Sequence, residues 1–137
     1  MDTVSSTTAH ATGDGRNGHV TSDDGIVDTD VRMPPALGGP GGATNPEQLF
    51  AAGYAACFHS ALRLVSTQEN VDVTDSEVSA TVHIGPEGAG FGLAVELDVS
   101  LPKAAADDAR RVTEKAHEVC PYSNATRGNI EVTLNVV

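Results

Sequence analysis

The spacing of hydrophobic and polar residues differs from segment to segment, and in the first part of the chain it predicts short strands. Residues 4–33 mix polar, small and β-branched residues around turn signals at 13–15 and 23–25, which predicts strands in a meander. The proline- and glycine-rich stretch at 34–42 sustains neither a helix nor a strand, because proline lacks a donor and glycine carries an entropic cost. The pattern therefore predicts a β-rich start that ends in a loop.

A long helix is the strongest element that the pattern predicts. Asn45 followed by Pro46 is typical of a helix start, because the residue before proline avoids the α region and proline is preshaped for the first turn. The helix is expected to run to about Thr67, and it is apolar nearly all round from Leu49 to Val65. Such a helix must be covered on more than one side, which a single sheet would not achieve.

A hairpin is expected after the long helix. Residues 71–73 and 77–84 alternate between polar and apolar at period two. A turn at 85–88 then precedes a second alternating run at 93–101. The two longer runs are therefore predicted to pair as antiparallel strands.

The end of the chain predicts a second helix, a break and a terminal strand. Pro102 is expected to open an amphipathic, half-exposed helix through roughly Glu118. Cys120-Pro121 interrupts it, residues 122–126 form a short turn or helix, and 130–137 alternates as a strand. The apolar positions of the helix are spaced three and four apart, at Ala105, Ala109, Val112, Ala116 and Val119.

These elements predict one α+β domain over residues 1–137, with about 1–9 flexible. Antiparallel strands from both ends of the chain are expected to pack around the long central helix. A chain of 137 residues is long enough to enclose a sizeable core.

The composition indicates a soluble, acidic protein. Nineteen acidic and 8 basic side chains give a formal charge of −11, which repels nucleic acid and anionic membrane surfaces. The acidic residues are scattered, so a solvated surface is favoured over an acidic binding face. Residues 1–25 contain no basic start followed by an apolar run, and no stretch approaches 18 apolar residues, so we expect a cytoplasmic protein with no membrane span.

Two cysteines are the first candidates for chemistry. In a reducing compartment they favour chemistry, metal binding or simple burial over a static disulfide. Cys57 lies among Ala55, Ala56 and Phe58, and position alone favours an inert core cysteine. Cys120, ahead of Pro121, suits the N-cap of a short helical segment, where backbone donors favour a negative sulfur. The two form a redox pair only if the helices bring their Cα atoms within about 7 Å.

Thiol chemistry at either position needs a lowered pKa. An unperturbed cysteine is only about 3% ionised at pH 7, and the thiolate is the nucleophile. A nearby arginine together with hydrogen bonds supplies a sufficient shift of the pKa. A cation is therefore the expected neighbour of a reactive cysteine.

Four stretches of the chain resemble the organic hydroperoxide resistance subfamily of the OsmC-like superfamily. They are Gly15-Arg16-Asn17-Gly18, TNPEQLFAAGYAACFHSAL at 44–62, IGPEGAGFGLAVELDVSLP at 84–102 and VCPYSNATRGNIEV at 119–132. The resemblance covers nearly the whole chain past residue 10. The ACF setting of Cys57 and the CPYS setting of Cys120 are similar to this subfamily rather than to its relatives.

The resemblance implies a peroxidase that protects against oxidative stress. Cys57 would attack the peroxide oxygen, become a sulfenic acid and be captured by Cys120 as a disulfide. Arg16 would stabilise the Cys57 thiolate and orient the peroxide, and Glu47 would hold Arg16 through a charge-assisted pair. Without the resemblance, Arg16 reads as a solvated turn residue and Glu47 as a first-turn acid that favours the helix dipole.

Substrate and reductant also follow from the resemblance. The implied substrates are alkyl and fatty-acid hydroperoxides, and the implied reductant is a lipoyl-type dithiol such as dihydrolipoamide or a lipoylated protein, with no bound cofactor. Apolar side chains near Cys57 could wall a hydrophobic pocket, although each is also a plausible core residue. The pocket candidates are Leu37, Phe50, Tyr54 and Phe58.

Helix geometry predicts an intertwined homodimer. Glu47 and Cys57 are ten residues apart on one helix, which separates them by about 15 Å along its axis. The glutamate also points toward the N-terminus, away from the thiol. If both serve one site, the Arg16–Glu47 pair must approach Cys57 of a second subunit, which also covers the apolar helix.

Other functions compete with the peroxidase. A metal site is conceivable from His19, His59, His83, His117 and the cysteines, but only His117 and Cys120 have helical spacing and no paired ligand motif accompanies them. A non-enzymatic hydroperoxide or fatty-acid binding module and a redox sensor are further alternatives. A simple disulfide oxidoreductase is a third, although the chain lacks a CxxC motif.

Overall fold

The computed structural model describes all 137 residues, which form two compact units. One unit comprises Met1–Leu49 and the other Phe50–Val137. The boundary falls inside the first α-helix, α1, which runs from Pro46 to Gln68.

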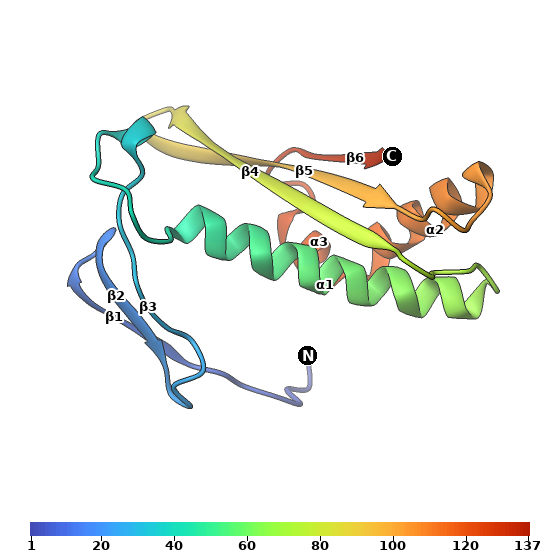
Figure 1. Cartoon of the computed structure of the whole chain (residues 1–137), viewed down its shortest axis with the longest axis horizontal. Coiled ribbons are helices and arrows are strands. Elements are labelled where there is room, and N and C mark those ends of the chain that lie inside the picture. The colour runs from blue at the N-terminus through green and yellow to red at the C-terminus, as the bar shows by residue number, and fades with distance from the viewer. The chain divides into compact units, whose positions relative to one another are not determined.

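The unit Met1–Leu49 is built on a small antiparallel sheet (Figure 1). Its strands are β1 (Ala9–Asp14), β2 (Asn17–Ser22) and β3 (Asp28–Asp30), in that spatial order, followed by the short 3-10 helix η1 (Pro35–Leu37). The β1–β2 turn is at Gly15-Arg16, where Gly15 has a φ of 61° that favours glycine. The predicted meander is confirmed, and it places Arg16 at the tip of a hairpin.

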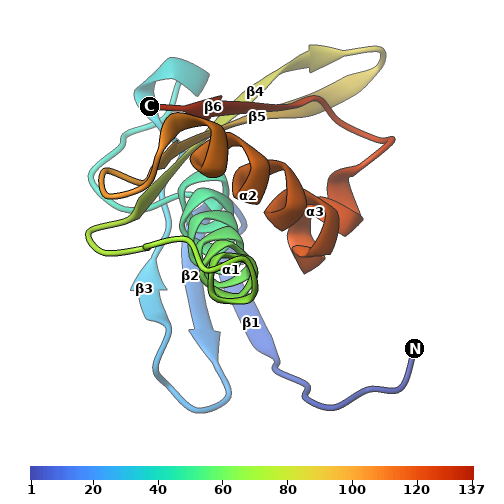
Figure 2. The same ribbon diagram turned by 90° about the vertical axis from the view of Figure 1, so that its right-hand side faces the viewer.

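The unit Phe50–Val137 combines most of α1 with a second three-stranded sheet. Figure 2 looks along α1 and shows the three helices of this unit on one side of that sheet. Its strand order is β4-β5-β6. The remaining elements of the unit are β4 (Glu77–Glu87), β5 (Gly90–Ser100), α2 (Ala106–Val119), α3 (Pro121–Thr126) and β6 (Val132–Val136).

The last strand departs from the predicted antiparallel pairing. β6 pairs with β5 in parallel, with Val132 opposite Val95 and Val136 opposite Val99, so the second sheet is mixed. A parallel neighbour requires a crossover connection, and α2 and α3 supply it between β5 and β6. The crossover places Cys120, at the α2–α3 junction, against the same face of the sheet as α1.

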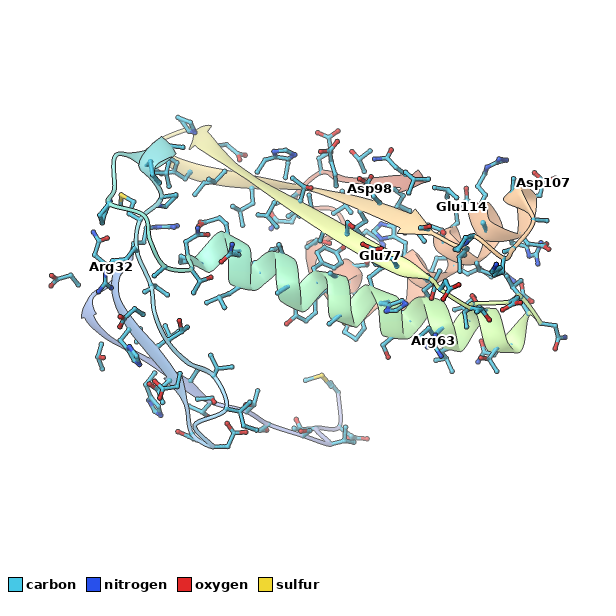
Figure 3. All side chains as sticks on the ribbon, in the orientation of Figure 1. Arg32, Arg63, Glu77, Asp98, Asp107 and Glu114 are labelled. Atoms are coloured by element: carbon cyan, nitrogen blue, oxygen red, sulfur yellow. The ribbon has the colours of Figure 1, made fainter.

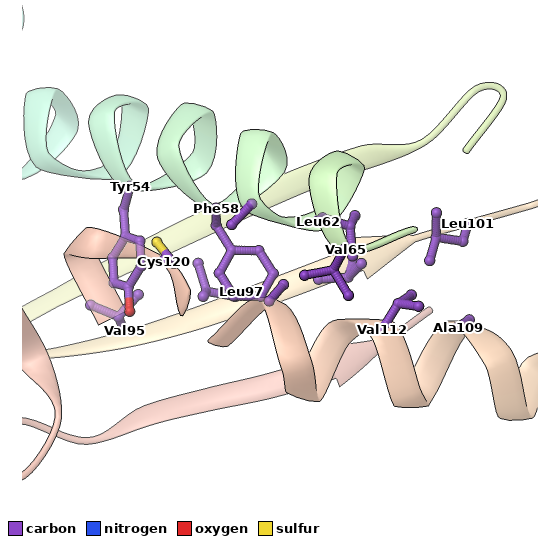
Figure 4. Close-up of a cluster of buried hydrophobic side chains, with 13 residues drawn as sticks. Tyr54, Phe58, Leu62, Val65, Val95, Leu97, Leu101, Ala109, Val112 and Cys120 are labelled. Atoms are coloured by element: carbon purple, nitrogen blue, oxygen red, sulfur yellow. The ribbon is translucent and has the colours of Figure 1, made fainter. Parts of the chain in front are cut away.

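The core lies between this sheet and the helices (Figure 4). β5 alternates, with Val95, Leu97 and Val99 turned inward. Burying each of these side chains stabilises the fold by about 1.5–3 kcal/mol. The other elements contribute Tyr54, Phe58, Leu62 and Val65 from α1, Ala109, Val112 and Ala116 from α2, and Cys120.

Two predictions around the hairpin are wrong. Residues 71–73 form no strand, because the Asp72 carboxylate accepts hydrogen bonds from the backbone and hydroxyl of Thr74 and turns the chain. The hairpin turn is at Gly88-Ala89 rather than at 85–88. Pro86 continues β4 because that strand is at the sheet edge, where a missing backbone donor is tolerated.

The second helix begins four residues later than predicted. α2 starts at Ala106 and not at Pro102, because the Ala104 N–H bonds back to Leu101 O and closes a turn first. Asp107 and Asp108 then occupy the first helical turn, where the helix dipole favours acids.

The length and composition of α1 meet the criteria for a membrane-spanning helix. Its mean hydropathy is 1.2 over an 18-residue window, although the polar residues His59, Ser60 and Arg63 interrupt the apolar run. The core helix of a soluble protein passes the same test. One side of α1 does pack into the core, through Tyr54, Phe58 and Leu62.

Candidate active site

Cys57 lies in the fourth turn of α1, on the border between the buried and exposed sides of the helix. The helix starts as predicted, with the Asn45 side chain accepting a hydrogen bond of 2.8 Å from the backbone N–H of Gln48. Phe58, the next residue, points fully into the core, which leaves the Cys57 side chain half-buried. The thiol is therefore held by a rigid helix and still reaches the surface.

Cys120 occupies the junction of α2 and α3 and is fully buried. It caps the C-terminus of α2 through its N–H to Ala116 O and is the N-cap residue of α3, with Pro121 in the first helical position. The predicted N-cap placement is confirmed. The Cys120 side chain makes no capping hydrogen bond, so its sulfur is free to face α1.

The sulfur atoms of the two cysteines lie 3.6 Å apart, and both thiols are free. A disulfide bond is about 2.05 Å long, so small side-chain movements of roughly 1.5 Å close the remaining gap. The proximity that the sequence could not establish is therefore present.

Burial raises the pKa of the Cys57 thiol, and the adjacent Cys120 adds to that rise. The backbone of Tyr122, in the first turn of α3, acts in the opposite direction and lowers the pKa of Cys57. Within Phe50–Val137 no basic side chain contributes to the pKa of Cys57. The lowered pKa that thiol chemistry needs is not supplied by this unit.

Arg16 and Glu47 form a bidentate ion pair within the unit Met1–Leu49. The two guanidinium nitrogens donate to the two carboxylate oxygens at 2.8 and 2.7 Å. The hydrogen bond from Arg16 lowers the pKa of Glu47, and the same bond raises the pKa of Arg16. The expected pair is present, and it fixes the Arg16 side chain by the first turn of α1.

A pocket of about 460 Å³ opens beside Cys57. Most of its lining is apolar, and Leu64 and Val119 at its rim are 58% and 55% exposed. The lining residues are Cys57, Ser60, Ala61, Leu64, Val119 and Pro121. An apolar group bound there would lie against the Cys57 thiol.

Two of the predicted substrate contacts do not line this pocket. Tyr54 and Phe58 have no exposed surface and belong to the core, so neither lines the pocket. Phe50 is partly buried against the rings of Tyr54 and Tyr122, and Leu37 is a partly exposed residue of the other unit.

Sequence reasoning missed the residues that do line the pocket, although a helical signal was available. Ser60, Ala61 and Leu64 follow Cys57 at spacings of three, four and seven and hence share its face. Val119 and Pro121, which also line the pocket, are the chain neighbours of Cys120. No local pattern connects them to Cys57.

A buried polar network holds α3 against α1 and α2. The Tyr54 hydroxyl is 2.9 Å from Ser123 Oγ and 3.2 Å from Thr126 Oγ1. His117 Nδ1 is 2.8 Å from the same Ser123 oxygen. Burial lowers the pKa of His117, and the charge of Arg127 lowers it further. The network fixes the segment that carries Cys120.

The histidines considered as metal ligands are apart from one another. His117 pairs with Ser123, His59 with Ser76 and His83 with Glu96, while His19 lies between Asp28 and Asp30. No group of three or more histidine, cysteine or acidic side chains has the geometry to hold a metal ion. The metal alternative therefore gains no support from the arrangement of these residues.

Charged side chains of the second unit extend outward (Figure 3). Glu77, Asp98 and Glu114 come from β4, β5 and α2, and Arg63 points away from the sheet. This distribution agrees with the expected solvated surface and leaves the thiol pair in apolar surroundings.

Comparison with known proteins gives a consistent match over nearly the full chain. The family described as OsmC-like protein matches residues 39–135. The organic hydroperoxide resistance protein of Xanthomonas axonopodis pv. citri (strain 306) is 48% identical over 132 residues, which cover 94% of this chain and 93% of the relative.

Two solved structures share both fold and sequence with this chain. An organic hydroperoxide resistance protein from Elizabethkingia anophelis is 53% identical, has a TM-score of 0.93, and the match covers 99% of this chain and 98% of that one. One from Legionella pneumophila is 48% identical, with a TM-score of 0.94 and 98% of each chain covered.

Proposed function

This chain belongs to the OsmC-like family, in its organic hydroperoxide resistance subfamily, and we propose that it is a thiol-dependent peroxidase that reduces organic hydroperoxides and protects against oxidative stress. The observation that carries the proposal is the 3.6 Å separation of the Cys57 and Cys120 sulfurs at the edge of an apolar pocket. A peroxidase of this kind needs a reachable thiol, a second thiol to resolve it, and room for an organic group. The site offers all three.

In the first step, the Cys57 thiolate attacks the terminal oxygen of the hydroperoxide. The O–O bond breaks, the sulfur is oxidised to a sulfenic acid, and the leaving alkoxide takes a proton to become an alcohol. Cys57 is the nucleophile because it is the half-exposed cysteine that lines the pocket, whereas Cys120 is fully buried. The backbone of Tyr122 lowers the pKa of Cys57 and so favours the thiolate.

In the second step, Cys120 attacks the Cys57 sulfenic acid. A sulfur–sulfur bond forms and the hydroxyl group leaves as water, which protects Cys57 from further oxidation. A dithiol reductant of the lipoyl type then returns the disulfide to two thiols and is itself oxidised to a cyclic disulfide. No bound cofactor takes part in this cycle.

Arg16 and Glu47 complete the site in the proposed mechanism. Arg16 uses two guanidinium donors on Glu47 and makes no other hydrogen bond, so further donors remain for a peroxide or a thiolate. Its positive charge would offset the rise in the pKa of Cys57 that burial causes. Glu47 keeps the guanidinium in one orientation, which a lone surface arginine lacks.

The site is proposed to form between the subunits of a homodimer. Ten residues of α1 separate Glu47 from Cys57, a distance of about 15 Å along the helix axis. The outer face of α1 is also exposed, and it combines small or apolar residues with the polar Gln48, Arg63 and Thr67. A second subunit that covers this face brings an Arg16–Glu47 pair to Cys57. The small or apolar residues exposed there are Leu49, Ala52, Ala56, Ser60 and Leu64.

The pocket favours an organic substrate over hydrogen peroxide. Ala61, Leu64 and Val119 offer an apolar wall to an alkyl or fatty-acid chain, which gains binding free energy as it leaves water. Hydrogen peroxide has no such group. We place this reaction in the cytoplasm, where a dithiol can be kept reduced.

Peroxide turnover with dihydrolipoamide tests the function. The native protein is expected to consume alkyl hydroperoxide catalytically and faster than hydrogen peroxide. Cys57→Ser abolishes turnover, and Cys120→Ser permits one oxidation event and then accumulates sulfinic acid at Cys57, detected by peptide mass spectrometry. A native protein that consumes no more than one equivalent of peroxide is a binding module or a sensor, and this result contradicts the proposal.

Sedimentation at micromolar concentration tests the shared site separately. A dimer is expected. Mixing inactive Arg16→Ala and inactive Cys57→Ser proteins should then restore activity, because one of the two sites in a mixed dimer receives both native residues. A strict monomer, or a mixture without recovered activity, rules out the shared arrangement.

A further inference from the structure

Gly53 is the only glycine in the 23 residues of α1, and the helix backbone does not require it. Its φ is not positive, so any residue could adopt its conformation. In the interior of a helix, glycine is also less stabilising than alanine. The reason for glycine at this position must therefore be space for a neighbouring group.

The neighbouring group is the ring of Tyr122. A Cβ atom at position 53 would lie 3.2 Å from the Tyr122 hydroxyl oxygen, 3.3 Å from Cε2 and 3.6 Å from Cζ. These distances leave no room for a side chain unless the ring moves outward by a few tenths of an ångström. The ring also packs beside Tyr54 and Phe50, with centroids 5.7 and 6.2 Å away.

The segment from Cys120 to Tyr122 thus contacts α1 at two points that are one helical turn apart. The Cys120 sulfur faces the Cys57 sulfur at 3.6 Å, and the Tyr122 ring lies on Gly53. Residues four apart share one face of a helix, so both contacts lie on the same side of α1. A displacement at one contact is transmitted to the other through a single intervening residue, Pro121.

We propose that Gly53 is a positioning residue for the Cys57–Cys120 pair, because the missing side chain lets the Tyr122 ring lie on α1 and hold the Cys120 sulfur within bonding reach of Cys57. The role of this position in peroxide reduction rests on the proposed function. The geometric claim itself concerns only the two sulfurs and the ring.

The backbone of Tyr122 gives independent support. The backbone of the residue that places its ring on Gly53 also lowers the pKa of Cys57. Outward movement of the ring would carry this backbone away from Cys57 and weaken the stabilisation of a thiolate. Gly53 therefore affects both the distance between the sulfurs and the reactivity of one of them.

Thiol–disulfide equilibrium with dithiothreitol tests the proposal without any peroxide. Oxidised dithiothreitol takes two electrons and two protons from Cys57 and Cys120, which form a disulfide, and is released as the dithiol. Gly53→Ala is expected to lower the equilibrium constant for disulfide formation by about three- to tenfold, because the sulfurs are held less well together. The pH midpoint of Cys57 alkylation by iodoacetamide, followed by peptide mass spectrometry, is expected to rise.

A double-mutant cycle separates the ring from other effects of alanine. Gly53→Ala should change neither quantity in a Tyr122→Ala background, because no ring remains to be displaced. Tyr122→Phe, which keeps the ring, should behave as the native protein does. Tyr122→Ala alone should lower the equilibrium constant even though Gly53 is intact, so the proposal stays testable if Gly53→Ala folds poorly.

Two results would overturn the proposal. The first is a Gly53→Ala protein whose equilibrium constant and alkylation midpoint equal those of the native protein. The second is a Gly53→Ala substitution that lowers the equilibrium constant equally in the native and the Tyr122→Ala background. A protein that shows the predicted cycle but turns over no peroxide would leave the role of Gly53 intact and refute only the peroxidase.

Discussion

The sulfur atoms of Cys57 and Cys120 lie 3.6 Å apart although 63 positions separate the two residues in the chain. Long-range packing brings them together, because Cys57 belongs to α1 and Cys120 to the α2–α3 junction. The core residues of β5 and the Tyr54–Ser123 hydrogen bond fix these elements against each other. Reactivity of the pair therefore depends on the stability of the whole unit Phe50–Val137.

Loss of the Arg16–Glu47 pair is expected to reduce peroxide turnover much more than stability. Arg16→Lys keeps the charge but loses the bidentate geometry, so kcat/KM for an alkyl hydroperoxide should fall by at least about tenfold. The free energy of unfolding should change by about 1 kcal/mol or less, since the pair is partly exposed. Arg32→Lys in the same unit is the control and should retain activity.

The stabilising effect of that pair should depend on pH with a defined sign. Arg16 lowers the pKa of Glu47 in the folded protein, so the pair stabilises the fold above the unfolded value, about 4.5, and the effect is lost as the pH falls through the folded pKa. The difference in unfolding free energy between the native protein and Glu47→Gln should therefore shrink on acidification. A difference that grows toward acid would contradict the assignment.

Removal of the Tyr54 hydroxyl should destabilise the protein. The hydroxyl bonds to Ser123 and Thr126 in a fully buried setting, so Tyr54→Phe is expected to lower the free energy of unfolding by about 1–2 kcal/mol. Tyr122→Phe is the matched control, because the Tyr122 side chain is 39% exposed and its hydroxyl makes no hydrogen bond. Urea denaturation of both variants measures the difference, and equal effects would argue against the buried network.

His117 should make the fold more sensitive to mild acid. Burial and Arg127 lower the pKa of His117 in the folded protein, so below the unfolded value of about 6.5 the unfolded chain binds the proton first and stability is lost as the pH falls. His117→Gln removes the titration, so its stability should fall less than the native protein's between about pH 7 and about pH 5.

Leu62 and Leu64 provide a matched test of the two sides of α1. Leu62 is fully buried and Leu64 is 58% exposed, although they are two residues apart on the same helix. Leu62→Ala is expected to cost about 2–5 kcal/mol of unfolding free energy, and Leu64→Ala about 0.5 kcal/mol in the monomer. Denaturation at several protein concentrations is needed, because a dimer that covers Leu64 makes its apparent contribution rise with concentration.

The sequence predicted the elements with strong local signals. Asn45-Pro46 marked the start of α1 to the residue, and Pro121 marked the break at which Cys120 serves as an N-cap. The hairpin turn was misplaced, because Pro86 looks like a turn residue unless it is known to lie in an edge strand. The strand predicted at 71–73 is absent because the hydrogen bonds that Asp72 accepts from Thr74 turn the chain there, and only two apolar residues favour a strand.

Only those residues of the candidate site that have a chemical role in the family were predictable from the sequence. The family resemblance singled out both cysteines and the Arg16–Glu47 pair, and the structure adds the distances within each pair. The pocket residues were mostly missed, because Tyr54 and Leu64 are both apolar residues of α1 and only packing separates core from surface. The parallel placement of β6 depends on a long crossover and has no local signal at all.

The parallel placement of β6 also determines when the two thiols can meet. β6 follows both cysteines in the chain, and the α2–α3 crossover is not secured until that strand has joined β5. A nascent chain therefore exposes Cys57 long before Cys120 has been made, let alone positioned. The Cys120 thiol therefore takes its place beside Cys57 only after β6 has been synthesised and has joined β5.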